Sequence, residues 1–390
     1  MKATINVGFI LQQSSAWMGG LNYFKNLFIA ISTVRDPMIQ PYIPLPKDPA
    51  SKVLLDYSCI VESYQIKTVK FYLKKLKNKI TGKNFCEKKN LKNIYKNLDL
   101  TSHSILINNL PGISWIPDFQ HLHLPEMFDK KDENFRNRDF LKKAKKSTIV
   151  VLSSNNALED YAFFAPQYKD KGRVLHFVSA IDSSVYTETD KQGQEIRKKY
   201  GLPEKYFYLP NQFWKHKNHG VVLKAISFLK KRGVKVNIVF SGNTQDYRFT
   251  NYFNEIVSFI KEEGISENVY ILGVIDPMEV YYLMRNCVSL INPSLFEGWS
   301  STVEEAKSLG KNIILSNLPV HREQNPQAAI FFDPNNPEEL SEILKEKWIQ
   351  GHYGPDKDLE ELAVRQLNER IIDFGKNYQK IVLECLEMGK

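Results

Sequence analysis

The chain has few cysteines and no pattern that would pair them. Its four cysteines, Cys59, Cys86, Cys287 and Cys385, lie far apart in 390 residues, and no Cys-x-x-Cys pair occurs. Disulfide frameworks and zinc sites use closely or regularly spaced cysteines. We therefore expect reduced thiols without metal in a cytoplasmic protein.

Long hydrophobic runs are also absent. No uninterrupted apolar stretch approaches the length of a transmembrane helix. The apolar stretch from Ile5 to Leu11 is short and lacks a cleavage site, so it is typical of a first strand rather than a signal peptide.

The sequence offers little for a metal bound to a diphosphate. Its one Asp-x-Asp, formed by Asp356 and Asp358, has no strand before it and is better interpreted as a solvated helix start. His121 and His123 would share a face on a strand, but a third ligand is not evident. We predict no metal and no other cofactor.

The length and the patterning that are present indicate two domains. A chain of 390 residues with 43% hydrophobic content exceeds what one core usually supports. Strand-like runs alternate with helix-like segments, the pattern of parallel sheets. We predict an α/β fold of two Rossmann-like domains, residues 1–187 and 188–364, with a linker near Tyr186 to Gly193 and a C-terminal helix at about 365–390.

Residues 292–306, NPSLFEGWSSTVEEA, are the most informative stretch. A strand-length apolar run precedes them, and the helical pattern that follows is ended by Gly310. A strand, a turn and a helix would therefore bring together Glu297, Glu305 and the backbone between them. Free N–H groups at a helix start suit a phosphate, and carboxylates accept hydrogen bonds from sugar hydroxyls. This chemistry fits a nucleotide-linked sugar.

Structural roles compete for the acidic residues of this stretch. Ser301-x-x-Glu304 has the spacing of a capping box, which predicts a structural role for one acid. Glu305 alone could be a solvated helix residue. The joint arrangement of Glu297 and Glu305 is what indicates a binding site.

With these residues, the sequence resembles retaining glycosyltransferase family 4, whose members have the GT-B fold. That family carries Glu-x7-Glu within Pro-Ser-x-x-Glu-Gly-aromatic and Glu-Ala, and the likeness continues through residues 308–320 and 331–334. The resemblance implies two domains that face each other across a cleft, with the last helix crossing back to the first domain. The matching positions are Pro293, Ser294, Glu297, Gly298, Trp299, Glu305 and Ala306.

The resemblance also implies a donor site. Glu305 would hold the ribose hydroxyls and Glu297 the sugar hydroxyls, while Gly19 and Gly20 would form a glycine-rich loop facing the diphosphate. Ser300, Ser301 and Thr302 stand where the family often has Gly-Leu-Pro, in a segment that acts mainly through its backbone. The other residues expected at the donor are Ser294, Gly298 and Trp299.

A basic clasp on the diphosphate is expected after the first strand of the second domain. Lys217 matches the family's lysine, and Asn218 commonly follows it. Asn211 stands where the family often has an arginine, so one positive charge is missing. Lys215 or His216 could supply it, or the helix dipole could suffice.

The acceptor side is expected at residues 115–126, WIPDFQHLHLPE. The family often carries a histidine or a His-Asp element at this place. The resemblance therefore implies Asp118 and His121 as catalytic groups beside Glu297 and Lys217. It leaves open whether Asp118, His121 or His123 acts on the acceptor.

Lysine is concentrated in residues 66–98, where Glu87 is the only acid. Apolar residues recur at three-to-four spacing between Val69 and Ile80, which indicates a basic amphipathic helix. An anionic membrane, nucleic acid and plain solubility compete as explanations. We favour docking on the cytoplasmic leaflet and expect no nucleic acid.

The sequence thus predicts a retaining, metal-independent glycosyltransferase. It would move a hexose from a UDP- or GDP-linked donor to a glycan or lipid-linked acceptor in lipopolysaccharide, O-antigen or capsule assembly. The expected location is the cytoplasm or the inner face of the plasma membrane. A sugar-nucleotide epimerase of similar fold and a catalytically silent glycosyltransferase-like partner are the alternatives.

Overall fold

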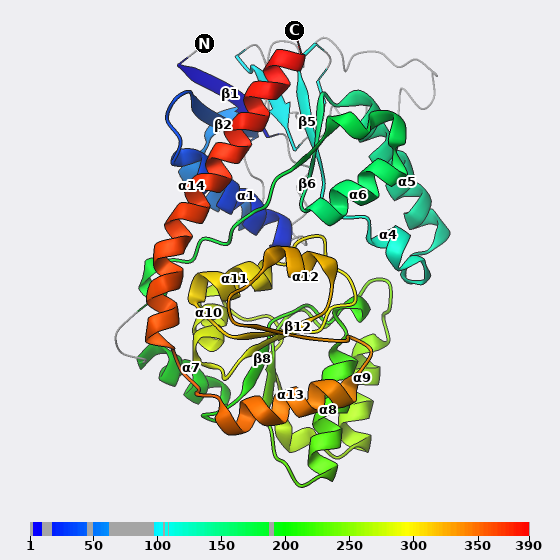
Figure 1. Ribbon diagram of the computed structural model, residues 1–390, viewed down its shortest axis with the longest axis vertical. Coiled ribbons are helices and arrows are strands. Elements are labelled where there is room, and N and C mark those ends of the chain that lie inside the picture. Colours follow the sequence, from blue (N-terminus) through cyan, green and yellow to red (C-terminus); the bar gives the residue numbers. More distant parts are fainter. Residues whose placement is uncertain are drawn as a thin grey trace, which may run out of the picture.

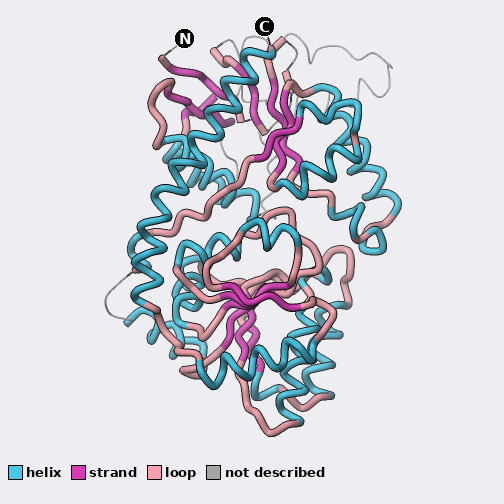
Figure 2. The backbone as a smooth tube through the Cα atoms, in the orientation of Figure 1, coloured by secondary structure: helices cyan, strands magenta, loops and turns pink. Residues whose placement is uncertain are grey.

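The computed structural model describes residues 3–9, 18–44, 50–61, 97–103, 106–107, 109–186 and 191–389. Two parallel sheets, each flanked by helices, form two lobes (Figure 1). The backbone view shows helices around the strands in each lobe (Figure 2). The prediction of two Rossmann-like α/β domains is confirmed.

The first domain is built on a sheet of seven strands in the order β3-β2-β1-β4-β5-β6-β7. All of its pairings are parallel. The strands are β1 (Thr4–Gly8), β2 (Met38–Pro44), β3 (Cys59–Val61), β4 (Leu100–Ser102), β5 (Gly112–Ile116), β6 (Ile149–Leu152) and β7 (Gly172–Val174). The helices are α1 (Met18–Ser32), η1 (Ala50–Tyr57), α4 (Gln120–His123), η2 (Pro125–Met127), α5 (Lys130–Lys146), α6 (Asn155–Phe164) and η3 (Pro166–Lys171).

The second domain has a sheet of six parallel strands in the order β10-β9-β8-β11-β12-β13. They are β8 (Phe207–Leu209), β9 (Ile238–Phe240), β10 (Val269–Ile271), β11 (Leu290–Asn292), β12 (Ile313–Ser316) and β13 (Ala329–Phe332). The helices are η4 (Ser183–Val185), α7 (Lys191–Tyr200), η5 (Lys215–Lys217), α8 (His219–Lys231), α9 (Tyr252–Glu262), η6 (Ser266–Asn268), α10 (Pro277–Asn286), α11 (Ser301–Leu309), α12 (Pro319–Gln324) and α13 (Pro337–Gln350).

The strand order reverses between β8 and β11 in the second domain and between β1 and β4 in the first. In open parallel sheets, ligands bind beyond the carboxyl ends of the strands at such a switch point. The loops that follow β8 and β11 carry most of the donor residues predicted from the sequence. Topology therefore places the predicted site where this fold binds ligands.

Local sequence explains where several helices begin. Asp129, Ser154 and Asn336 precede α5, α6 and α13, and each side chain accepts a hydrogen bond from a backbone N–H of the first turn. Such caps satisfy donors that have no partner inside the helix. Strands are marked in a different way, by short apolar runs. Ile149–Leu152, for example, is buried along its whole length, as is typical of a strand in a parallel sheet with both faces covered.

The chain passes between the domains shortly after β7. Phe177 and Val178 pack in the core of the first domain, whereas Ile181 and Val185 pack in a core of the second. The side chains therefore change domain a few residues before the linker predicted near Tyr186.

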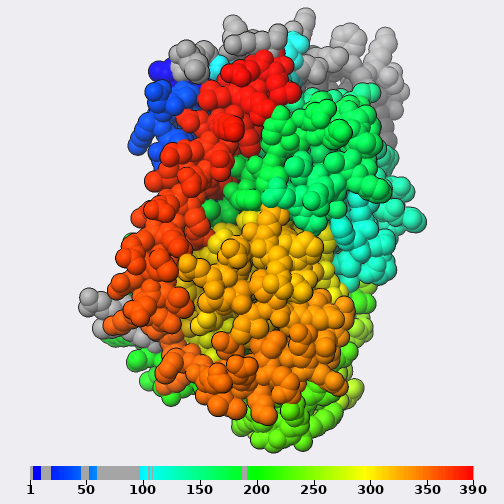
Figure 3. Space-filling view, viewed as in Figure 1, coloured from blue at the N-terminus to red at the C-terminus, as the bar shows by residue number. Residues whose placement is uncertain are grey.

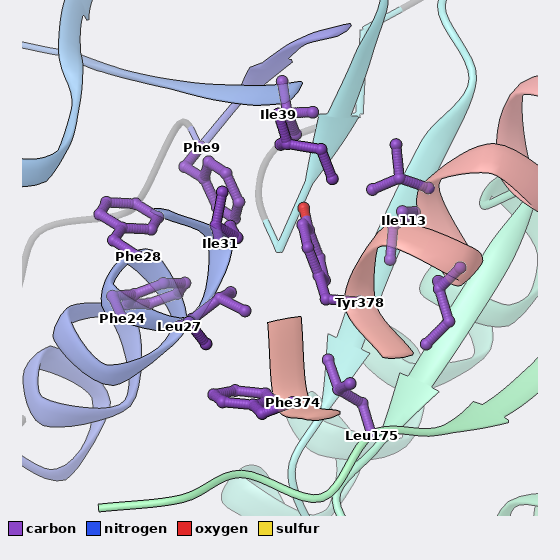
Figure 4. Packing of buried hydrophobic residues seen from close by; sticks show 14 of the residues in the cluster. Phe9, Phe24, Leu27, Phe28, Ile31, Ile39, Ile113, Leu175, Phe374 and Tyr378 are labelled. Atoms are coloured by element: carbon purple, nitrogen blue, oxygen red, sulfur yellow. The ribbon is translucent and has the colours of Figure 1, made fainter. Parts of the chain in front are cut away.

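The last helix, α14 (Lys357–Met388), joins the two domains. Near its start, Glu360 pairs with Arg285 of the second domain. Farther along, Phe374 and Tyr378 lie between Leu27 of α1 and Ile113 of β5 (Figure 4). Figure 3 shows the helix, in red, running along both lobes. The predicted crossing back to the first domain is confirmed.

This helix begins directly after Pro355, where the sequence predicts a long helical segment, and residues from about 365 onward are the part expected on the first domain. Asp356 is its N-cap and accepts a hydrogen bond from Leu359 N at 3.2 Å. The Asp-x-Asp pattern therefore marks a helix start, as predicted. The first turns pack on the second domain, where the carbonyl oxygen of Leu359 lies against Gly310.

Three predictions concern absences. Within the described residues, Cys287 and Cys385 are free and buried. No described helix is long and apolar enough to cross a membrane, and no described cluster of three histidine, cysteine or acidic side chains could hold a metal. The basic segment from Val69 to Ile80 lies outside the described residues, so its membrane role stays a prediction.

The contact between α14 and α1 has no room for another carbon atom. A Cβ added at Gly375 would collide with the carbonyl oxygen of Ala30. We expect Gly375→Ala to lower the free energy of unfolding by about 1–3 kcal/mol, measured by urea denaturation.

The matched control is Gly220→Ala, in the first turn of α8, where an added Cβ meets nothing within 4 Å. This variant is expected to keep or slightly raise stability, because alanine favours a helix by up to about 1 kcal/mol over glycine. Equal urea midpoints for the two variants would show that the α1–α14 contact is not tight.

Candidate active site

The β11–α11 loop (residues 293–300) forms the predicted strand-to-helix turn. Ser300 is the N-cap of α11, and its Oγ accepts hydrogen bonds from Val303 N at 3.4 Å and Asn292 Nδ2 at 2.8 Å. Within the described residues, the backbone N–H groups of Ser301 and Thr302 donate no hydrogen bond. These free donors and the helix dipole together can bind an anion.

The predicted capping box is wrong. Ser301 lies inside α11 and Ser300 caps it, so Glu304 has no capping role. Glu304 is instead buried and pairs with Arg370 of α14 at 3.0 Å and Lys307 at 3.2 Å. The acid is structural, as expected, but it fastens α14 to α11.

Gly298 brings the loop into contact with the first domain. A Cβ built there would collide with Pro117 O and lie 2.8 Å from Asp118 Cβ. Only glycine permits this approach, because any side chain would displace backbone. The first domain's residue Asp118 therefore lies directly against the β11–α11 loop.

Lys217 and Glu297 form a buried ion pair in this region. Lys217 Nζ is 2.7 Å from Glu297 Oε1, and the side chains are 15% and 9% exposed. Ser294 Oγ also lies 2.7 Å from Glu297 Oε1. Burial opposes ionisation, but the charge of Lys217 and these hydrogen bonds lower the pKa of Glu297 to about 2. Glu297 is therefore an anion at neutral pH.

Glu305 has the opposite character. It is half-buried on α11 and forms no hydrogen bond or ion pair with the described residues. Burial raises its pKa to about 8. The two glutamates of the Glu-x7-Glu pattern thus differ in charge at neutral pH.

Asn211 ties the two loops of the switch point together. Its Oδ1 accepts a hydrogen bond from Thr302 Oγ1 at 3.0 Å, and its Nδ2 donates to Asn292 Oδ1 at 3.3 Å. Asn211 is therefore a neutral bridge from the β8 loop to α11.

Asn218 joins a further pair of loops. Its φ of 55° is left-handed, a conformation that asparagine tolerates. Its Nδ2 donates to Pro293 O at 3.1 Å and Pro334 O at 2.9 Å. This geometry fixes the end of η5 and so the position of Lys217.

Trp299 contacts the first domain. Its Nε1 donates to Phe177 O at 3.0 Å, and its ring stacks on His176 at 4.3 Å. His176 in turn lies 2.6 Å from Glu323 of α12. The tryptophan thus links the β11–α11 loop to the segment where the chain crosses between domains.

The first domain's predicted groups are only partly described. Gly19 is exposed and Gly20 buried in the first turn of α1, while residues 10–17 lie outside the described part. Asp118 Oδ1 accepts from Gln120 N at 3.0 Å and pairs with Arg136 at 3.1 Å.

The two predicted histidines lie in the short helix α4 rather than on a strand. His121 is 1% exposed, packs against Phe119 and Phe140, and lies 3.0 Å from Asn137 Oδ1. Burial lowers its pKa, which favours the neutral ring.

His123 has different neighbours. Its Nε2 pairs with Asp160 at 2.8 Å, and its ring lies 5.1 Å from that of Phe296 in the β11–α11 loop. The two histidines therefore have separate partners. His123, like Asp118, lies next to the β11–α11 loop.

Sequence reasoning missed His321, which directly follows the segment that resembles the family. This fully buried histidine has Nδ1 2.8 Å from Ser316 O, so Nδ1 carries a proton and Nε2 is an acceptor. Nε2 has no hydrogen-bond partner among the described residues. Ser316 also donates its Oγ to Ser294 O at 2.6 Å, and Ser294 holds Glu297, so His321 lies near the ion pair.

Comparisons with known proteins find similarity to glycosyltransferases. Residues 192–352 match the family model described as "Glycosyl transferases group 1". The O-antigen biosynthesis glycosyltransferase WclY of Escherichia coli is 24% identical over 196 residues, which are 50% of each chain. The chain spans about half the length of the curated relatives it matches.

Solved structures match over nearly the whole chain. Anabaena HepE, in complex with UDP and glucose, has a TM-score of 0.67 at 13% identity and covers 97% of this chain and 99% of its own. WaaG, a glycosyltransferase involved in lipopolysaccharide biosynthesis, has a TM-score of 0.54 at 13% identity, covering 96% and 95%. These likenesses confirm the GT-B fold.

The pKa of Glu305 predicts a pH-dependent stability. The folded protein keeps a proton on Glu305 up to about pH 8, whereas the unfolded chain releases it near 4.5. Stability is therefore lost as the pH rises through this window. Glu305→Gln should remove the loss and raise the free energy of unfolding at pH 8 by about 1–3 kcal/mol.

Glu304→Gln is the matched control, since it makes the same chemical change at the adjacent position. It should instead lower stability, because Arg370 loses its ion pair. Urea denaturation at pH 5 and pH 8 measures both. A Glu305→Gln variant with the pH profile of the wild type would contradict the assigned pKa.

Proposed function

We propose that the protein is a retaining glycosyltransferase that uses a nucleotide-sugar donor. The observation that carries this proposal is the buried Lys217–Glu297 pair beside the free N–H groups of α11. A cation and helix dipole suit a diphosphate, and an ionised carboxylate suits sugar hydroxyls. The likeness to an O-antigen glycosyltransferase supports the reaction class.

The donor would lie between the loops of the switch point. Lys217 and the N–H groups of Ser301 and Thr302 would contact the diphosphate. Glu297 would accept hydrogen bonds from the hexose, and Glu305 from the ribose. The UDP and glucose bound by HepE support a UDP-hexose, and GDP is the alternative nucleotide.

The reaction would break the bond between the anomeric carbon and the diphosphate oxygen. The acceptor oxygen would bond to the same face of the sugar, and its proton would pass to the leaving phosphate. Lys217 and the N-terminus of α11 would stabilise the negative charge that develops on the diphosphate, without a metal. Glu297 would act by binding the sugar, and a covalent glycosyl-Glu297 intermediate is the less favoured alternative.

The acceptor would bind on the side of the first domain, near Asp118 and His123. We propose a glycan or lipid-linked acceptor in surface-polysaccharide assembly. The similarity to WclY and to WaaG supports this acceptor class.

Lys217→Ala tests the assigned transition-state role. Turnover of a panel of UDP- and GDP-hexoses, measured as released nucleoside diphosphate, should fall on the order of 10²–10³-fold. Lys224→Ala removes the same charge from an exposed position on α8 and should leave turnover unchanged. If Lys217 were only structural, its loss would lower the melting temperature but not turnover per folded molecule.

A chelator tests the absence of a metal requirement. Turnover in excess EDTA should match turnover without it, because Lys217 and the helix dipole supply the charge. Loss of activity that magnesium or manganese restores would contradict the metal-independent mechanism. Conversion of the donor sugar to an epimer without any acceptor would favour the epimerase alternative.

A further inference from the structure

Arg248, in the loop after β9, is a buried cation with little compensation. Its side chain is 9% exposed, and its Nε has no hydrogen-bond partner among the described residues. Asp246 Oδ1 is 4.0 Å from Nε and already accepts from Arg248 N at 2.9 Å. The other oxygen, Oδ2, accepts from Lys215 N at 3.0 Å. Burying a charge without strong partners is costly, so such a group commonly serves a ligand.

Two contacts of the Arg248 guanidinium reach the first domain. Nη1 is 3.5 Å from Gln120 Oε1, and the guanidinium lies 4.7 Å from the centre of the Phe128 ring. Gln120 is also buried, and its Nε2 has no partner among the described residues. Gln120 of the first domain and Arg248 of the second thus meet at the domain interface, and each has an N–H donor without a partner among the described residues.

The contact between Arg248 and Gln120 lies next to the Lys217–Glu297 pair. Arg248 Nη2 is 3.4 Å from Nδ1 of His216, the residue before Lys217. The backbone of His216 also accepts a hydrogen bond from Leu295 N of the β11–α11 loop at 2.8 Å. Arg248 therefore stands beside the loops that hold the proposed diphosphate.

Three other groups fail to replace the missing arginine charge. Asn211 is neutral, and its amide is engaged by Thr302 and Asn292. Lys215 is exposed, with Nζ 4.5 Å from the centre of the Phe249 ring. Burial and the charge of Lys217 hold the pKa of His216 well below its ordinary value, so its ring is neutral.

We propose that Arg248, assisted by Gln120, binds phosphate oxygens of the nucleotide sugar's diphosphate across the domain interface. This proposal rests on the proposed function. A guanidinium offers a planar fork of donors that matches phosphate oxygens, and the Phe128 ring orients it. Arg248, in the loop after β9, would then supply the positive charge that Asn211 does not provide in the β8 loop. Arg248 would contact the ligand from the second domain and Gln120 from the first.

Binding of UDP and GDP, compared with uridine and guanosine, tests the proposal by calorimetry. Arg248→Gln should weaken the nucleoside diphosphate that the wild type binds by about 10–100-fold and leave its nucleoside unchanged. Arg248→Lys keeps the charge without the fork and should weaken it less. Gln120→Ala should also weaken the diphosphate selectively.

Lys224→Gln is the control for net charge and should bind like the wild type. Equal diphosphate affinity in Arg248→Gln and wild type would overturn the proposal. So would an equal loss for diphosphate and nucleoside, because that pattern indicates a structural role. Wild-type protein that binds neither UDP nor GDP would contradict the proposed function and this proposal together.

Discussion

The buried Lys217–Glu297 ion pair is the interaction on which the site depends. Removing one partner of such a pair typically costs about 3–5 kcal/mol, because the other charge stays buried. Lys217 ends the short helix η5 and Glu297 lies on a loop, so their positions need support. Asn218 fixes the turn before α8, and Ser294 holds Glu297. These contacts keep Lys217 and Glu297 within reach of each other.

The features that could be predicted from the sequence are those encoded locally. An apolar run, a turn and a helix ended by Gly310 define the β11–α11 unit, and Gly310 has the left-handed φ of 62° that this ending requires. The strand order of the sheet then places this unit at the switch point between β8 and β11. The fold class and the placement of Lys217, Glu297 and Glu305 at the switch point could therefore be predicted from the sequence. Their roles are proposals.

Long-range contacts explain what could not be predicted. Gln324 of α12 bonds to both backbone groups of Ser300 and, with Asn292, selects it rather than Ser301 as the cap. Arg248 lies in the loop after β9 and His321 in α12, and neither has a sequence pattern that relates it to Glu297. Such residues meet only after the sheet has formed.

The way in which α14 completes the first domain has a consequence for synthesis on the ribosome. The core around β1 and α1 needs Phe374 and Tyr378, which are translated after the whole second domain. The second domain's core is built from residues 181–344, so it can close while the first still exposes apolar surface. The first domain is therefore translated first, but the last residues of its core are made only after the whole second domain.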